Sequence, residues 1–271
     1  MYTFDSRIRY SETDENAVLT IESLINYFQD CSTFQTEDAG AGFSWLSAQH
    51  LAWVLNYWQI DIFRLPALYE HVTVGTVPYA LKGFTGLRNY FMDTAPGEGR
   101  TPERLATANS VWALMDMEKM FPSRVSPEHA SRYDLEEKLP MEYLDRKIRL
   151  PEKSLTLEAE PVTVHHSHLD TNLHVNNGQY VRIALSALAQ IWEEVAGDLW
   201  NVQSVEQTMT KSVRLRAEYK KQAHLDDVLQ RVVHLSGDKP EERTLYVDLR
   251  LNGESCCVVS LSRLPEVAEE S

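Results

Sequence analysis

The sequence HLDTNLHVNNGQY, residues 168–180, decides the fold, because three polar residues stand two apart and lead directly into a helical pattern. In an extended segment successive side chains point in opposite directions, so Asp170, Asn172 and His174 are predicted to project to one side. A carboxylate, an amide and an imidazole would then meet at one place.

The two asparagines that follow are typical of the start of a helix. Asn176 and Asn177 are good N-cap residues for the apolar-periodic run 180–196, and the spacing predicts a helix over 176–196. The first N–H groups of a helix have no partner within it, and the helix dipole is positive at that end. The backbone at Asn176 and Asn177 is therefore a candidate site for stabilising an oxyanion.

The polar pattern occurs a second time, earlier in the chain, as SETDENAVLT, residues 11–20. One offset of 156 residues (170 − 14) pairs three positions, namely Ser11 with Ser167, Asp14 with Asp170, and Asn16 with Asn172. Carried forward without a gap, it also aligns Ala67 with Ala223 and Glu70 with Asp226. We predict that the chain consists of two copies of one unit.

The two copies differ where chemistry would be expected. Val18 stands at the position of His174, and Pro66 stands at the position that the ungapped offset gives to Gln222. Only the second copy combines the carboxylate, the amide and the imidazole. We therefore expect a single active site, in the second half of the chain.

In each copy, the polar segment and its helical pattern are followed by four β-rich runs. These are 53–63, 72–77, 87–92 and 108–117 in the first copy, and 212–219, 228–235, 244–251 and 255–262 in the second. One long helix followed by consecutive strands predicts an α+β fold, with an antiparallel sheet wrapped on the helix. We place the first domain at 1–120, a linker rich in proline and charge at 121–154, and the second domain at 155–271.

Composition excludes several classes of protein. The formal net charge of −14 argues against general nucleic-acid binding, which needs a basic surface. No apolar run reaches membrane-spanning length, and the first repeat begins within a few residues of Met1, which leaves no room for a signal or transit peptide. We expect a soluble, cytoplasmic protein without membrane insertion.

Neither the cysteines nor the histidines indicate a metal site. The three cysteines, two of them adjacent at Cys256 and Cys257, form no disulfide framework and no zinc pattern, and we expect them to be reduced core residues. A cluster of four histidines invites a metal interpretation, but its spacing fits no common zinc site. These residues are His165, His166, His168 and His174.

The motif Asp170-x-Asn172-x-His174-Val-Asn-Asn177, followed further along by EYKK (218–221) and DVL (227–229), resembles the acyl-acyl carrier protein (acyl-ACP) thioesterases of plants and bacteria. The resemblance extends over nearly the whole chain. It implies a tandem hotdog fold whose N-terminal unit holds the acyl chain and whose C-terminal unit is catalytic. By similarity, Asp170, Asn172 and His174 are the catalytic residues. The implied activity is hydrolysis of the acyl thioester, with acylated carrier protein as partner, free fatty acid as product and no cofactor.

One departure from the plant pattern bears on the mechanism. Where the plant enzymes carry a Glu-Cys pair after the basic dipeptide, this chain has Gln222 and Ala223. A thiol nucleophile is therefore absent at this position. Asp170 or His174 is left to activate water, while Gln222 can only orient it by hydrogen bonding. Our hypothesis is that Asp170 holds or activates the water with the help of His174, and that Asn172 positions the thioester. A nucleophilic role for Asp170 through a mixed anhydride stays open.

Two features have a structural interpretation beside the functional one. Asp170 and Asn172 also suit turn and cap positions, and the first copy keeps both without the histidine. The densest basic stretch of this acidic chain could dock an acidic carrier protein, or could be the solvated outer face of a sheet. Its members are Lys211, Arg214, Arg216, Lys220 and Lys221.

Three alternative functions fit parts of the pattern. A hotdog acyl-CoA thioesterase would share the chemistry but act on another carrier. A hydratase or dehydratase also combines Asp, His and Asn, but its pattern has a proline after the asparagine, where Leu173 stands here, and a wider gap before the histidine. A non-catalytic acyl-thioester sensor would not need His174. The sequence leaves acyl-chain length open, and it fits a monomer or a homodimer.

Overall fold

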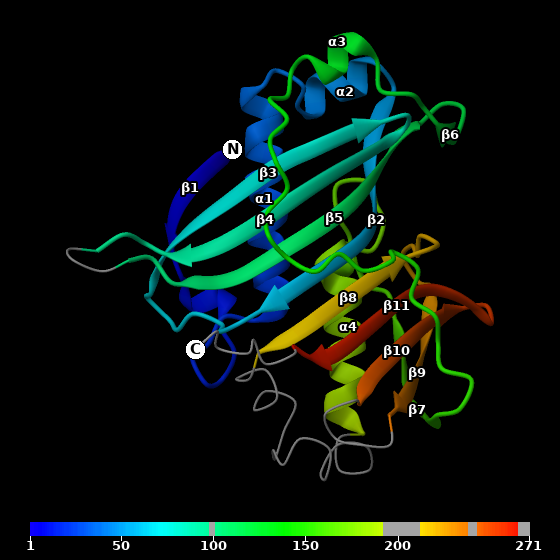
Figure 1. Ribbon diagram of the computed structural model, residues 1–271. Coiled ribbons are helices and arrows are strands. Elements are labelled where there is room, and N and C mark those ends of the chain that lie inside the picture. The colour runs from blue at the N-terminus through cyan, green and yellow to red at the C-terminus, as the bar shows by residue number, and fades with distance from the viewer. Residues whose placement is uncertain (98–100, 192–211, 238–242, 265–271) are drawn as a thin grey trace. The chain divides into compact units, whose positions relative to one another are not determined.

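The computed structural model describes residues 1–97, 101–191, 212–237 and 243–264 (Figure 1). The chain forms two compact units. Unit 1 comprises Met1–Gln59 and Leu65–Arg146, and unit 2 comprises Ile60–Arg64 and Lys147–Ser271. The division after Arg146 falls inside the predicted linker 121–154, whose two ends remain a prediction. Within the described ranges, none of the helices has the length and apolar character that a membrane span requires.

Unit 1 is an antiparallel sheet with a long helix across one face (Figure 1). The strand order is β1-β3-β4-β5-β2, with β6 paired to β5. In chain order its elements are β1 (Tyr2–Arg7), the 3-10 turn η1 (Tyr10–Glu12), α1 (Ile21–Asp38), α2 (Phe43–Ala48), β2 (Leu51–Ile62), β3 (His71–Lys82), β4 (Thr85–Thr94), β5 (Arg104–Asp116), β6 (Phe121–Pro122) and α3 (Pro127–Ala130).

Helix α1 forms where its apolar residues recur at helical spacing. The Thr20 hydroxyl caps the helix by accepting a hydrogen bond from the Ser23 N–H at 3.1 Å. The apolar stripe, which includes Leu24, Ile25 and Phe28, is fully buried against the sheet. Burial of this stripe, more than helix propensity, holds α1 in place.

Unit 2 repeats this architecture with the strand order β8-β11-β10-β9-β7. Its helix α4 packs on β7, β9, β10 and β11 and lies across one face of the sheet (Figure 1). The elements are β7 (Leu155–Thr163), the 3-10 turn η2 (His166–His168), α4 (Asn177–Gln190), β8 (Val213–Tyr219), β9 (Val228–Ser236), β10 (Thr244–Leu251) and β11 (Glu254–Arg263). The prediction of one long helix and an antiparallel sheet in each copy is confirmed.

The predicted helix over 176–196 begins as expected. Asn176 is the N-cap, and its Oδ1 accepts a hydrogen bond from the Gly178 N–H at 2.8 Å. The helix is described to Gln190, with Ile191 as its C-cap. The rest of the predicted span, 192–196, lies outside the described residues.

The internal repeat is visible in the hydrogen bonds of the two polar loops, 9–20 and 165–176. The Arg9 N–H donates to the Glu12 carboxylate at 2.9 Å, and the His165 N–H donates to Nδ1 of His168 at 3.1 Å, at the predicted offset of 156. Each loop then ends on the same backbone bond, from Thr20 to Glu12 in unit 1 and from Asn176 to His168 in unit 2.

The second half of each copy corrects the ungapped alignment. The Ala67 N–H donates to the Glu70 carboxylate, and the His224 N–H donates in the same way to Asp227, which requires an offset of 157 (224 − 67). The left-handed residues Tyr69 and Asp226 agree with this value. The second copy thus has one extra residue before this turn. In the corrected alignment of the two copies, Pro66 is equivalent to Ala223, not to Gln222, and Ala67 is equivalent to His224.

Candidate active site

The loop from Leu169 to Val175 is a tight turn, which corrects the prediction of an extended segment. The Asp170 N–H donates to the His174 carbonyl at 2.8 Å, and the Leu173 N–H donates to the Asp170 carbonyl at 3.0 Å. Leu173 has the left-handed φ of 62° and is exposed. Alternation along a strand therefore does not bring the polar side chains together; the closure of the turn does.

The Asp170 carboxylate closes this turn. Its Oδ1 accepts hydrogen bonds from the backbone N–H groups of Asn172 at 2.8 Å and His174 at 3.4 Å. Such side-chain bonds compete with strand pairing, and this is why the segment is not extended. The turn role that the sequence left open is thus present. It ties the backbone N–H of His174 to the half-buried Asp170 carboxylate.

His174 is half-buried and suited to accept a proton. Burial lowers its pKa below the usual value of 6.5, the nearby His224 lowers it further, and the Asp170 carboxylate opposes both effects. The imidazole is therefore neutral at pH 7, as a general base must be. Asn172, in contrast, is exposed.

The segment 220–224 is attached to this loop through Ala223. The Val175 N–H donates to the Ala223 carbonyl at 3.0 Å, and the Ala223 N–H donates to the hydroxyl of Tyr180 at 2.7 Å. Tyr180 lies in the first turn of α4, so helix, loop and segment are bonded together at one place. Gln222 is exposed and adjoins Ala223 on one side.

On the other side of Ala223 lies His224, which the sequence analysis missed. Its ring lies against that of His174, with the ring centroids 4.8 Å apart and the planes at 78°. Among the residues singled out from sequence, the structure therefore brings Asp170 and His174 together directly. Gln222 is linked to them through the backbone of Ala223.

One predicted oxyanion donor is wrong. The Asn176 N–H donates to the His168 carbonyl at 2.8 Å, so it is not available to a reacting oxygen. The bond closes the loop just as the Thr20 N–H does in unit 1, which makes it part of the shared fold. Asn177, whose carbonyl accepts from the Tyr219 hydroxyl at 3.0 Å, remains the candidate donor.

The predicted docking residues separate into two groups. Arg214 is buried, with 7% of its surface exposed, and its Nε and Nη2 donate to the two carboxylate oxygens of Asp61 at 2.6 and 2.7 Å. Its assignment to a docking surface is therefore wrong. Lys220 and Lys221 are exposed, and Lys221 pairs with Glu254. Arg216 is half-buried, and Lys211 lies outside the described residues.

The cysteines of unit 2 do not offer a nucleophile. Cys256 and Cys257 lie in β11 and are fully buried. Burial raises the pKa of the Cys256 thiol to about 12, so the reactive thiolate is not formed at neutral pH. Among the described residues, no cluster of three or more His, Cys, Asp or Glu could hold a metal ion.

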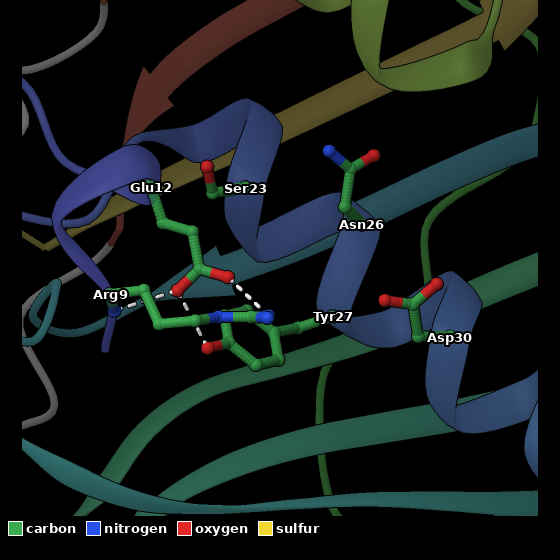
Figure 2. Close-up of a pocket in the computed structure, with 6 residues that line it drawn as sticks. All are labelled: Arg9, Glu12, Ser23, Asn26, Tyr27 and Asp30. Atoms are coloured by element: carbon green, nitrogen blue, oxygen red, sulfur yellow. Dashed lines mark hydrogen bonds and ion pairs between the residues drawn. The ribbon is translucent and has the colours of Figure 1, made fainter. Parts of the chain in front are cut away.

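Unit 1 has a small polar pocket beside its own first loop, at residues that are not equivalent to Asp170, Asn172 and His174. Figure 2 shows a pocket between the first loop and α1, in which Glu12 pairs with Arg9 and accepts a hydrogen bond from the Tyr27 hydroxyl at 2.8 Å. Its volume of about 50 Å³ is far below the several hundred Å³ of an ordinary small-molecule site. The lining residues are Arg9, Glu12, Ser23, Asn26, Tyr27 and Asp30. This pocket has no imidazole.

Two family models match the chain. Residues 1–133 match the acyl-ACP thioesterase N-terminal domain, and residues 164–262 match the thioesterase-like superfamily. The N-terminal half of the chain thus matches the acyl-ACP thioesterase family, and the C-terminal half matches a broader thioesterase superfamily. The resemblance noted from the motif is thus confirmed.

Solved structures of thioesterases share the fold of this chain. An acyl-ACP thioesterase from Bacteroides thetaiotaomicron superposes with a TM-score of 0.76 at 22% identity, covering 96% of each chain. The 12:0-ACP thioesterase from Umbellularia californica gives a TM-score of 0.74 at 16% identity, covering 98% of this chain and 97% of its own. These matches confirm the predicted α+β hotdog fold.

Curated relatives are plant enzymes. A chloroplastic acyl-[acyl-carrier-protein] hydrolase from Cuphea viscosissima is 26% identical over 265 residues, which cover 94% of this chain. A chloroplastic palmitoyl-acyl carrier protein thioesterase from Gossypium hirsutum is 25% identical over 248 residues, covering 86% of this chain. This chain spans 60% and 55% of the length of these two relatives.

Proposed function

We propose that this protein hydrolyses the thioester of fatty acyl-ACP, releasing free fatty acid and ending chain elongation. The observation that carries the proposal is His174: a half-buried imidazole with a lowered pKa, held in a turn that the chain builds twice but equips with a histidine only once. The relatives named as acyl-ACP hydrolases support the choice of substrate.

The reaction needs water, a base and an oxyanion site. Neutral His174 accepts a proton from water as the water oxygen attacks the thioester carbonyl, and the Asp170 carboxylate stabilises the imidazolium that forms. The C–S bond then breaks, the imidazolium returns the proton to the sulfur, and the products are a fatty acid and the free thiol of the carrier.

Three further residues complete the proposed site. The Asn177 N–H stabilises the tetrahedral oxyanion at the start of α4, where the helix dipole favours negative charge. Asn172, exposed beside His174, positions the thioester, and Gln222 orients the water by hydrogen bonding. This assignment makes His174 the base, because the Asp170 oxygen Oδ1 already accepts two backbone hydrogen bonds.

The partner of the reaction is acylated carrier protein, whose acidic surface would meet the exposed Lys220 and Lys221. The acyl chain itself would be held by unit 1. The location in the cytoplasm and the state as a monomer or homodimer remain predictions.

Thiol release from matched acyl-ACP and acyl-CoA substrates of increasing chain length tests the function. We expect faster release from the carrier-protein substrates, and the fastest substrate then gives the chain length. A preference for acyl-CoA would instead assign the chain as an acyl-CoA thioesterase. Stoichiometric binding without thiol release would show a sensor.

A further inference from the structure

His224 is held beside the catalytic loop by backbone contacts on both of its sides. The carbonyl of the preceding Ala223 accepts the Val175 N–H at 3.0 Å. The His224 N–H donates to Oδ2 of Asp227 at 2.7 Å, and Nδ1 of His224 lies 3.8 Å from the same oxygen. The position of this residue is therefore fixed, while its side chain is 57% exposed.

The His224 ring contacts the ring of the proposed base. The centroid distance of 4.8 Å and the angle of 78° describe an edge-to-face arrangement with His174. Such a contact restricts the rotation of the His174 ring about its χ2 torsion, which is otherwise broad for an imidazole.

Unit 1 provides an internal comparison for this pair. At the two equivalent positions it has Val18 and Ala67, which form a β-bridge. The supporting bond is the same, because the Ala67 N–H donates to the Glu70 carboxylate at 2.9 Å. The loops therefore fold with no histidine at either position. Both imidazoles occur together, and only in the unit with the proposed site.

Three influences act on the protonation of His174. Burial and the charge of His224 lower its pKa, and the Asp170 carboxylate raises it. The carboxylate of Asp227 lies 3.8 Å from Nδ1 of His224 and therefore faces the His224 ring. Among these groups, His224 is the one whose ring contacts the ring of His174.

We propose that His224 is a positioning residue for His174: the contact between the two rings fixes the orientation of the His174 imidazole. The inference rests on the proposed function in one respect, that His174 is the base.

Two variants separate orientation from charge. His224→Ala places in unit 2 the residue that unit 1 has at this position, so the loop should fold. His224→Lys restores a positive charge without the ring. His166→Gln is the matched control, because it removes another exposed histidine from the same unit. Each variant is measured by the pH profile of kcat/KM and by an NMR titration of the His174 ring, assigned from the signal lost in His174→Val.

In His224→Ala we expect the His174 titration midpoint and the acid limb of kcat/KM to move up by roughly half a pH unit, the size of a water-screened charge interaction at about 5 Å. The plateau of kcat/KM should fall several-fold. In His224→Lys the acid limb of kcat/KM should stay at or below its wild-type pH, and the plateau value of kcat/KM should fall as much as in His224→Ala. The control His166→Gln should match wild type both in the position of the acid limb and in the plateau of kcat/KM.

A wild-type midpoint and a wild-type plateau in His224→Ala would overturn the inference. The NMR titration does not depend on turnover. A midpoint that moves in a protein without thiol release would therefore support the contact while rejecting the proposed function.

Discussion

Asp14 and Asp170 occupy the same position in two copies of one turn, and each carboxylate accepts the backbone N–H groups two and four residues further on. The distances are 2.9 and 3.0 Å for Asp14, and 2.8 and 3.4 Å for Asp170. The shared role of the aspartate is thus to shape the turn. The catalytic role proposed for the aspartate belongs only to the copy with His174.

This pairing predicts different outcomes for two matched substitutions. Asparagine can accept the same backbone bonds, so Asp14→Asn and Asp170→Asn should each cost less than about 1 kcal/mol of stability. Only Asp170→Asn should reduce kcat, by at least about tenfold, because the imidazolium loses its carboxylate. Since Asp170 raises the pKa of His174, its loss should also move the acid limb of kcat/KM to lower pH. Equal activity of the two variants would contradict a catalytic role for Asp170.

The burial of His129 predicts that the folding stability of unit 1 decreases at acidic pH. It is 1% exposed, both ring nitrogens lack a hydrogen-bond partner, and its ring packs against Trp45 at 4.9 Å. Burial lowers its pKa in the folded state. Below about pH 6.5 the unfolded chain therefore binds a proton that the folded chain does not, and stability falls as the pH falls.

His129→Phe should keep the aromatic packing and remove this contribution, so Tm measured between about pH 7 and 5 should decline less steeply than in wild type. His168, His174 and His234, whose pKa values burial also lowers, should account for the slope that remains. An unchanged slope would show that His129 is not responsible.

The buried pair of Arg214 and Asp61 should be sensitive to the loss of either partner. The side chains are 8% and 6% exposed, and the contact is bidentate. Arg214→Met should lower the free energy of unfolding by roughly 3–5 kcal/mol, because Asp61 is left as an unpaired buried charge. Adding Asp61→Leu should recover much of that loss. Denaturant unfolding of the two variants measures both, and a loss below about 1 kcal/mol in Arg214→Met would contradict the burial of the pair.

Lys220 and Lys221 distinguish a docking surface from a solvated sheet face. If they meet the carrier protein, Lys221→Glu should raise KM for acyl-ACP several-fold, leave kcat unchanged and leave KM for acyl-CoA unchanged. Lys119→Glu, at an exposed lysine of unit 1, is the control. An equal KM for acyl-ACP in wild type, Lys221→Glu and Lys119→Glu would favour the interpretation of these lysines as the solvated face of a sheet.

Much of the fold could be predicted from sequence because burial follows periodicity. Leu24, Ile25 and Phe28 recur at the helical spacing that α1 buries, and Asn176 marks the start of α4. The turn at Asp170 was harder, because the bond from its side chain to the Asn172 N–H competes with the extended backbone that alternation assumes.

The remaining errors concern contacts that are distant in the chain. Arg214 looked exposed because its partner Asp61 lies 153 residues earlier. His224 was overlooked because the ungapped offset pairs Ala67 with Ala223. The inserted residue becomes apparent only from the matching turns at Tyr69 and Asp226, where φ is 69° and 66°.

The most direct test of the account is kcat for acyl-ACP hydrolysis by His174→Val, which gives unit 2 the residue that unit 1 has at Val18. Because the turn folds with valine in unit 1, Tm should change little, while kcat should fall by roughly 10²–10⁴-fold. A His174→Val protein that stays folded and keeps kcat within a few-fold of wild type would contradict the central claim, that this imidazole is the base.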